Sequence, residues 1–320
     1  MKKIIAMLMA CLFVLSFTTA FAEREKTLSI VCTTFPQYDW VRQILGDRVD
    51  DVELTLLLDN GVDLHNYQPT ADDIIKIAQS DLFIYVGGES DGWVEDVLAT
   101  AQNPNLKTVN MLESVEAKEE ETVEGMQEEE HDHEEEHDHD EIEYDEHVWL
   151  SLRNAETLTQ TIADTLGELA PDNASVYQEN AKSYIAQLSE LDNQYKDAVK
   201  NGQRKTILFA DRFPFRYLAD DYGLAYYAAF VGCSAETEAS FETIAFLAKK
   251  VDELNLPVVL TIEGANHAIA ETVVSSTQAK NQKILTMNSI QSVTESDIAD
   301  GASYLGIMTE NLVVLKEALN

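Results

Sequence analysis

The sequence predicts an α/β fold of two lobes, each a mainly parallel sheet flanked by helices, joined by one long interlobe helix. Short β-branched segments alternate with amphipathic helical segments in both halves of the chain, a pattern typical of parallel sheets covered on both faces. Between the halves, residues 174–200 contain no Gly or Pro. As a helix they would span roughly 40 Å at 1.5 Å per residue. A single large sheet is the alternative. A chain of 320 residues that is 45% hydrophobic can bury two cores of ordinary size.

In the first half, the expected strands are short apolar runs that stop at a Pro, a Gly or a turn. They cover residues 28–34, 51–61, 81–88 and 106–112. Helical periodicity fills the gaps, from Pro36 to about Gly46 and over 70–81 and 91–102. Thr70 is the expected N-cap of the second of these helices, because its hydroxyl can accept from a first-turn backbone N–H.

In the second half, a long helical stretch over 154–200 is broken only around 171–173, and the strand–helix alternation then resumes. The expected strands are 205–211, 225–233, 257–264 and 283–288. The expected helices are 216–224, 240–256, 268–281 and one final helix. The predicted organisation is a signal peptide (1–22), an N-terminal lobe (23–173) with an acidic, His-rich loop at about 114–143, a linking helix (174–201) and a C-terminal lobe (202–320).

The first residues are typical of a secretory signal, with two lysines, an apolar stretch over 4–17 and an Ala-Phe-Ala cleavage site at 20–22. We therefore expect an exported protein, located in the periplasm or at the outer face of the cytoplasmic membrane. A lipid anchor at Cys11 is a weaker alternative, because more apolar sequence follows it. Cys32 and Cys233 remain after cleavage, and the sequence leaves open whether they pair or are small buried thiols.

The formal net charge is −36, and residues 113–146 supply half of it, with 19 acidic residues and one lysine. So acidic a chain lacks the basic face that binds phosphates, which argues against nucleic acid and favours cations as partners. Four histidines are interspersed in the acidic run: His131, His133, His137 and His139. These residues predict a loop that gathers metal ions weakly; a solvated acidic linker is the alternative.

The same run contains His133-Glu134-Glu135-Glu136-His137, which matches the H-E-x-x-H of zinc peptidases. A peptidase needs these residues on one face of a packed helix, with a third ligand beyond. The run has almost no apolar residue with which to pack, and Glu/His-rich sequence produces the pattern by chance. The peptidase interpretation is therefore disfavoured.

Three histidines occupy strand ends or loops elsewhere: His65, His147 and His267. Together with Asp211 at the end of an expected strand, they would suit a tetrahedral zinc site of nitrogen and oxygen ligands. Taken singly, each histidine is more often a hydrogen-bonding surface residue. Asp211 could equally pair with Arg212 or cap the next helix.

Several segments resemble, in order, the solute-binding proteins of zinc and manganese ABC transporters, the cluster A-I family. They are "VCTTFPQYDWVRQILGD", "DLHNYQPTADD", "SDLFIYVGGESDGWVEDVL", "DEHVWLSLRNA", "FRYLADDYGL" and "LTIEG". The resemblance covers nearly the whole chain after the signal peptide. It implies a two-lobed receptor that holds a metal ion between its lobes.

The resemblance also implies a ligand set. His65 and His147 match the first two family histidines. The third position falls on Arg212, which cannot coordinate a metal, so that either Asp211 replaces it or the ligand is missing. The fourth position falls on His267. Arg212 would then neutralise Glu263, and both are expected around the ligands.

We accordingly expect a non-enzymatic receptor that delivers Zn²⁺ to an ABC permease with its ATPase, as a monomer that binds no nucleic acid. Three imidazoles favour zinc, whereas Mn²⁺ prefers oxygen-rich surroundings and is the alternative cargo. A zinc-dependent hydrolase is a less favoured hypothesis, as is an adhesin or zinc buffer that works without a permease.

Overall fold

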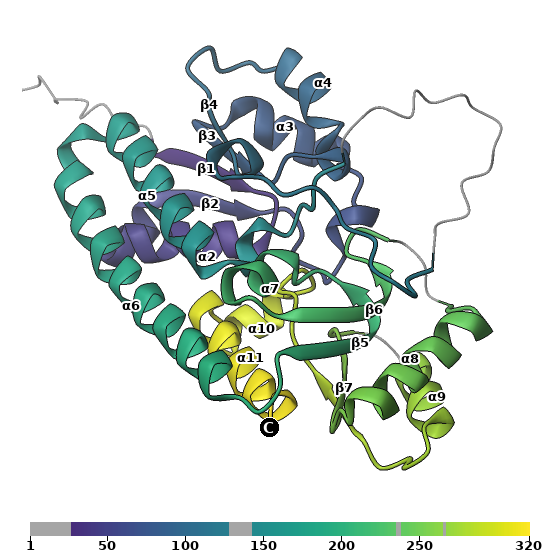
Figure 1. Ribbon diagram of the computed structural model, residues 1–320. Coiled ribbons are helices and arrows are strands. Elements are labelled where there is room, and N and C mark those ends of the chain that lie inside the picture. The colour runs from purple at the N-terminus through teal and green to yellow at the C-terminus, as the bar shows by residue number, and fades with distance from the viewer. Residues whose placement is uncertain (1–26, 128–142, 235–237, 265–266) are drawn as a thin grey trace, which may run out of the picture.

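The computed structural model describes residues 27–127, 143–234, 238–264 and 267–320. Two sheets of four parallel strands are flanked by helices, and one long helix runs between them (Figure 1). The predicted two-lobed α/β fold is therefore confirmed over the single large sheet. The expected signal peptide and four loop histidines (His131, His133, His137 and His139) lie outside the described residues.

The N-lobe sheet has the order β2-β1-β3-β4, with every neighbouring pair parallel. Its strands are β1 (Leu28–Cys32), β2 (Val52–Leu56), β3 (Leu82–Tyr85) and β4 (Lys107–Asn110). Its helices are α2 (Phe35–Leu45), α3 (Ala71–Gln79), α4 (Val94–Ala99) and α5 (Leu152–Leu169). Thr70 does cap α3, since its side chain accepts from the backbone N–H of Asp73. Helix α4 is shorter at both ends than predicted, and a separate 3-10 turn occupies Glu89–Asp91 before it.

The C-lobe sheet repeats this order as β6-β5-β7-β8, again with parallel pairs. Its strands are β5 (Thr206–Phe213), β6 (Ala225–Val231), β7 (Val258–Thr261) and β8 (Lys283–Thr286). Its helices are α7 (Arg216–Tyr222), α8 (Phe241–Leu254), α9 (Ala268–Ser276), α10 (Glu295–Ala299) and α11 (Tyr304–Ala318). The predicted final helix is α11, and a separate short helix, α10, precedes it, with Gly301 between them at a φ of +96°. Strand β5 continues past Asp211 through an irregularity in its pairing with β6.

Helix α6 (Ala174–Asn201) is the long interlobe helix. It packs on α5 and α2 of the N lobe and on α11 of the C lobe (Figure 1). Asn180 donates to the carbonyl of Ile44 at 3.0 Å, and the hydroxyl of Tyr195 donates to the carbonyl of Met308 at 2.6 Å. One continuous helix therefore fixes an element of each lobe.

A single apolar cluster also crosses between the lobes. It includes Trp40 and Trp149 of the N lobe and Tyr304 of the C lobe, all fully buried. The indole N–H of Trp149 donates to the carbonyl of Ser289 at 2.8 Å, and the hydroxyl of Tyr304 donates to the carbonyl of Trp149 at 2.6 Å. A second, smaller cluster lies in the C lobe, among residues of β5–β7, α8 and α9. The lobes are thus joined by a shared core as well as by a helix.

A further connection is made by residues 118–127, here called the strap, which follow the N-lobe sheet but lie against the C lobe. The backbone N–H of Lys118 donates to the hydroxyl of Tyr217 at 3.0 Å. At the other end, the backbone N–H of Gln127 donates to the carbonyl of Ala229 in β6 at 2.9 Å. The returning chain is held as well, since Glu119 forms an antiparallel bridge with Tyr144. Both ends of the acidic segment are therefore anchored.

None of the helices in the described part of the chain is long and apolar enough to span a bilayer.

The interlobe core generates a stability prediction. Tyr304→Phe removes the hydroxyl that satisfies the buried carbonyl of Trp149, at an expected cost of about 1–3 kcal/mol in the free energy of unfolding. Urea denaturation of the metal-free protein measures this cost. Tyr144→Phe is the control, because Tyr144 is 44% exposed and should change stability by less than about 0.5 kcal/mol. Equal stability of the Tyr304 variant and the wild type would contradict a role for this bond in joining the lobes.

Candidate metal site between the lobes

His65 lies in the loop between β2 and α3, on a 3-10 turn over Leu64–Asn66. The carboxylate of Asp63 caps this turn by accepting from the backbone N–H of His65 at 3.0 Å. The other oxygen of Asp63 pairs with the guanidinium of Arg212, from the C lobe, at 2.5 Å. Burial opposes ionisation of Asp63, but the positive charge of Arg212 holds its pKa below the usual value. The turn that carries His65 is thus fixed by a charge from the other lobe.

His147 follows the returning acidic segment and precedes a 3-10 turn over Val148–Leu150, all of whose side chains are buried. One carboxylate oxygen of Asp145 accepts from both the backbone N–H (2.8 Å) and the ring Nδ1 (3.0 Å) of His147. The ring is fully buried. Because Trp149 is locked into the interlobe core, His147 has a fixed position shortly before it.

The two imidazoles face each other through their Nε2 atoms, which are 3.2 Å apart. Asp145 faces the Nδ1 of His147, and the hydroxyl of Ser90 (2.8 Å) and a carboxylate oxygen of Glu146 (3.5 Å) face the Nδ1 of His65. With a proton on each Nδ1, both Nε2 lone pairs point at the same place. Such support of one ring nitrogen by an acceptor, with the other nitrogen free, is typical of metal-binding histidines.

The environment also sets the protonation of the two rings. Burial lowers the pKa of His65 to about 3, and the neighbouring positive charge of protonated His147 contributes to this shift. Burial alone would lower the pKa of His147 as well, but the Asp145 carboxylate raises it above its ordinary value. A proton is therefore held on His147 at pH values below its raised pKa, and a bound cation must displace it. Cation affinity is expected to fall as the pH drops through that value.

Two further side chains reach this pair from the C lobe. The side-chain Nε2 of Gln291 lies 3.1 Å from the Nε2 of His147, and its Oε1 is buried without a hydrogen bond among the described residues. The thiol of Cys233 completes a group with His65 and His147 in which the ligand atoms all lie within 4.8 Å of one another. Burial, then the charges of Asp145 and Glu120, raise the pKa of this thiol well above its ordinary value.

The other two predicted ligands, His267 and Asp211, hydrogen-bond to other groups of the C lobe. The Nδ1 of His267, at the start of α9, lies 3.0 Å from the hydroxyl of Thr261. The carboxylate of Asp211 accepts from the backbone N–H groups of Arg212 (2.9 Å) and Ile262 (3.3 Å). Neither residue belongs to the group of possible ligands found in the described part of the chain. Their ligation remains a prediction from the resemblance.

Arg212 and Glu263 do not pair as the sequence suggested. Arg212 comes from β5 and crosses to Asp63, while Glu263 accepts from the backbone N–H (2.6 Å) and the hydroxyl (2.7 Å) of Ser289. Glu263 is satisfied by the loop after β8, which also carries Gln291. Arg212 therefore holds the turn that carries His65, and Glu263 holds the loop that carries Gln291.

Sequence reasoning missed five residues of this cluster: Ser90, Asp145, Glu146, Cys233 and Gln291. Asp145 and Glu146 stand immediately before His147, and acidic neighbours of a candidate ligand are a signal that could have identified them. The sequence alone could not show which of the two cysteines lies at the site. Both are free: Cys32 is buried in β1, and Cys233 is half-buried at the site.

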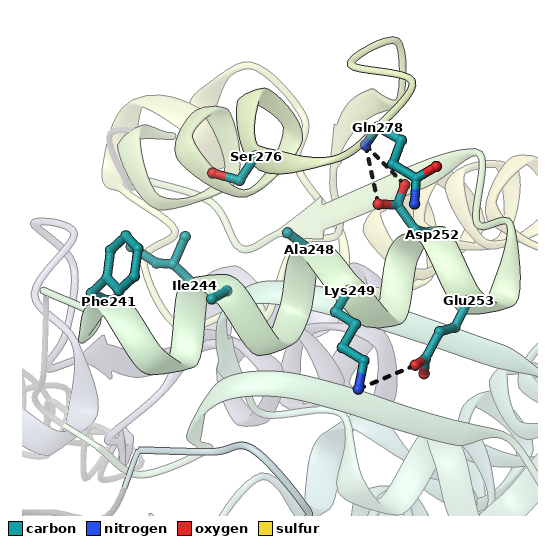
Figure 2. Close-up of a pocket in the computed structure, with 9 residues that line it drawn as sticks. Phe241, Ile244, Ala248, Lys249, Asp252, Glu253, Ser276 and Gln278 are labelled. Carbon is teal, nitrogen blue, oxygen red and sulfur yellow. Dashed lines mark hydrogen bonds and ion pairs between the residues drawn. The ribbon is translucent and has the colours of Figure 1, made fainter.

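A hollow of about 580 Å³ lies elsewhere, along α8 and the end of α9. Figure 2 shows Phe241 and Ile244 at one end, with the carboxylate of Asp252 accepting from the backbone N–H of Gln278 at the other. None of the residues that line it is a His or Cys. This hollow lacks the donor set gathered between the lobes.

The geometry predicts that Asp145 positions His147 without touching the ion. Asp145→Asn removes the carboxylate that orients the ring, and zinc affinity should fall about 10–100-fold. Competition with a chromophoric zinc chelator measures the change. Asp39→Asn is the matched control, because Asp39 is equally buried but accepts from the backbone N–H of Tyr304 in the interlobe core. An equal loss of affinity in both variants would contradict a specific role for Asp145.

The chain is similar to proteins that are named for zinc binding or zinc uptake. The chain is 32% identical over 319 residues to the zinc-binding lipoprotein AdcA of Streptococcus pneumoniae, covering 99% of this chain but only 61% of that protein. It is 32% identical to the high-affinity zinc uptake system protein ZnuA of Bacillus subtilis, covering 91% of this chain and 88% of that protein.

Among solved structures, the Zn(II)-bound ZnuA-like domain of S. pneumoniae AdcA is similar with a TM-score of 0.72 at 29% identity. The match covers 92% of this chain and 99% of that domain. A family model described as zinc-uptake complex component A, periplasmic, matches residues 30–318, and the chain therefore belongs to this family.

Proposed function

We propose that this protein is an extracytoplasmic zinc receptor that delivers the ion to an ABC permease with its ATPase. The observation that carries the proposal is the pair of buried imidazoles, His65 and His147, whose Nε2 atoms face each other at 3.2 Å. Two buried lone pairs at this distance repel each other unless a cation or a proton lies between them. Zinc uptake is named for the relative in B. subtilis and, through the family description, for the family itself.

Zinc is favoured over manganese by the donors at the site. Neutral imidazole nitrogen suits Zn²⁺, whereas Mn²⁺ prefers carboxylate, carbonyl and water oxygens. The carboxylates of Asp145 and Glu146 face the Nδ1 atoms of the histidines, on the side of each ring away from its Nε2. They are placed to orient imidazoles and to balance the charge of a cation.

A receptor is favoured over a zinc hydrolase by the burial of the site. The side chain of His65 is 6% exposed and that of His147 is fully buried. A hydrolase needs an open coordination position next to a substrate pocket. The enclosed histidine pair provides a place for an ion, and burial of both rings limits the access of a substrate to it.

Release to the permease requires only local movement in this proposal. The shared apolar core and α6 join the lobes, so wide hinge opening would expose Trp149 and its neighbours to water. Movement of the C-lobe loops after β6 and β8 would withdraw Cys233 and Gln291 from the histidines and leave the core intact. A monomer contains all of these elements.

The direct test is zinc binding by two single variants. His65→Ala or His147→Ala should abolish tight stoichiometric zinc binding, because each removes one of two facing donors. Isothermal titration calorimetry of metal-free protein measures this, with manganese titrated in parallel. His267→Ala tests the ligand expected from the resemblance, and Asp211→Ala its possible replacement for Arg212. Tighter binding of manganese than zinc by the wild type would overturn the choice of cargo. Unchanged zinc binding in both His65 and His147 variants would overturn the site.

The loop histidines call for a separate experiment, and the strap determines its design. Deletion of the whole acidic segment would remove the hydrogen bonds of Gln127 and the bridge of Glu119. Replacing His131, His133, His137 and His139 together by Asn leaves these anchors in place. We propose that this variant loses weak additional zinc sites and keeps the tight one, as measured by equilibrium dialysis over a wide range of zinc concentrations. Loss of the tight site would show that the loop supplies a ligand.

A further inference from the structure

We infer that Cys233 is a metal ligand, a thiolate that the C lobe adds to the two imidazoles of the N lobe. The inference rests on the proposed zinc-binding function and names a donor that the family resemblance did not assign. It would make the site a nitrogen–sulfur site that takes thiophilic ions such as zinc and cadmium in preference to manganese.

The distances among the three donors fit one tetrahedral ion. With metal–nitrogen bonds near 2.05 Å, two imidazole nitrogens on a tetrahedral zinc are about 3.3 Å apart. The observed separation of the His65 and His147 Nε2 atoms is 3.2 Å. A nitrogen and a sulfur on the same ion are about 3.6 Å apart, since zinc–sulfur bonds are near 2.3 Å. The sulfur of Cys233 lies within 4.8 Å of one ring nitrogen of each histidine, so that a shift of about 1 Å would bring it to the distance that one ion requires.

The backbone around Cys233 is built for this close approach. Cys233 follows β6 by one residue, Gly232. A Cβ at Gly232 would lie 3.0 Å from the carbonyl oxygen of Phe213 and 3.2 Å from both a carboxylate oxygen of Asp145 and the Cε1 of His147. The turn therefore lies directly against His147 because residue 232 has no side chain. The backbone N–H of Cys233 donates to the Glu120 carboxylate of the strap at 3.0 Å, which fixes the turn in place.

Cys32 provides the contrast that makes this interpretation specific. Cys32 is fully buried in β1 within the apolar core, where a thiol behaves as a small hydrophobic group. Cys233 instead lies among Glu120, Asp145 and the two imidazoles. In these polar surroundings its thiol does not pack as a small hydrophobic group. The two thiols are not joined in a disulfide, and the Cys233 thiol donates to the Glu120 carboxylate, a hydrogen bond that a metal ion would replace.

Cobalt(II) gives a direct test, because a thiolate ligand produces a charge-transfer band in the near ultraviolet that imidazole does not. Wild type and Cys32→Ser should both show this band on titration with Co²⁺, and Cys233→Ser should bind Co²⁺ without it. Zinc affinity of Cys233→Ser should fall about 100-fold or more, since loss of a ligand costs more than loss of its supporting hydrogen bond. Manganese affinity should change little, so that the preference for zinc over manganese shrinks by the same factor.

The outcomes separate the inference from the function on which it rests. Two results would overturn the inference and leave the proposed receptor function standing. One is tight zinc binding by a wild type whose Co²⁺ form lacks the thiolate band, and the other is unchanged zinc affinity in Cys233→Ser. Failure of the wild type to bind zinc or cobalt would overturn both. Cys233→Ala keeps the test valid if the Ser variant misfolds, and circular dichroism of each metal-free variant checks its fold. Zinc should also protect Cys233, in the wild type, from alkylation by iodoacetamide.

Discussion

The burial of Trp149 between the lobes is the constraint on which the rest of the structure depends. Its indole and its carbonyl are both bonded to C-lobe residues, and its ring is enclosed by the shared core. His147 stands two residues before it and Asp145 four residues before it. Fixing Trp149 therefore fixes the orientation of one donor, and the ring of His65 is held against that donor by the other lobe through Arg212 and Asp63.

The proposed site already holds its two imidazole rings so that their Nε2 atoms face each other. Each imidazole has its Nδ1 hydrogen-bonded, so that the two Nε2 atoms converge at 3.2 Å and repel each other when both rings are neutral. Around them lie buried polar atoms without hydrogen bonds among the described residues, the Gln291 amide oxygen and one Glu146 oxygen. Unsatisfied buried groups cost about 1–3 kcal/mol each. In the proposed site, a cation held by the two Nε2 atoms would remove their repulsion without any large rearrangement.

Much of the fold could be predicted from the sequence, and the site only in part. Alternating strand and helix patterns identified both sheets, and the Gly- and Pro-free stretch identified α6. The irregularity in β5 and the short helix α10 escaped, because they depend on tertiary contacts. His65 and His147 stood out as lone histidines near strand ends. Cys233 and Gln291 did not, since only the folded chain brings their C-lobe loops to the two histidines. Arg212 showed where the resemblance fails, but its partner Asp63 lies 149 positions away.

The anchored strap has a consequence for how this protein can vary. Hydrogen bonds to Tyr217 and Ala229 hold one end of the acidic segment, and the bridge from Glu119 to Tyr144 holds the other. The stretch between these anchors can gain or lose residues without shifting His147, because doubling a loop's length costs only about 0.6 kcal/mol in closure entropy. The position of His147 therefore depends on these anchors and not on how many histidines the stretch between them carries.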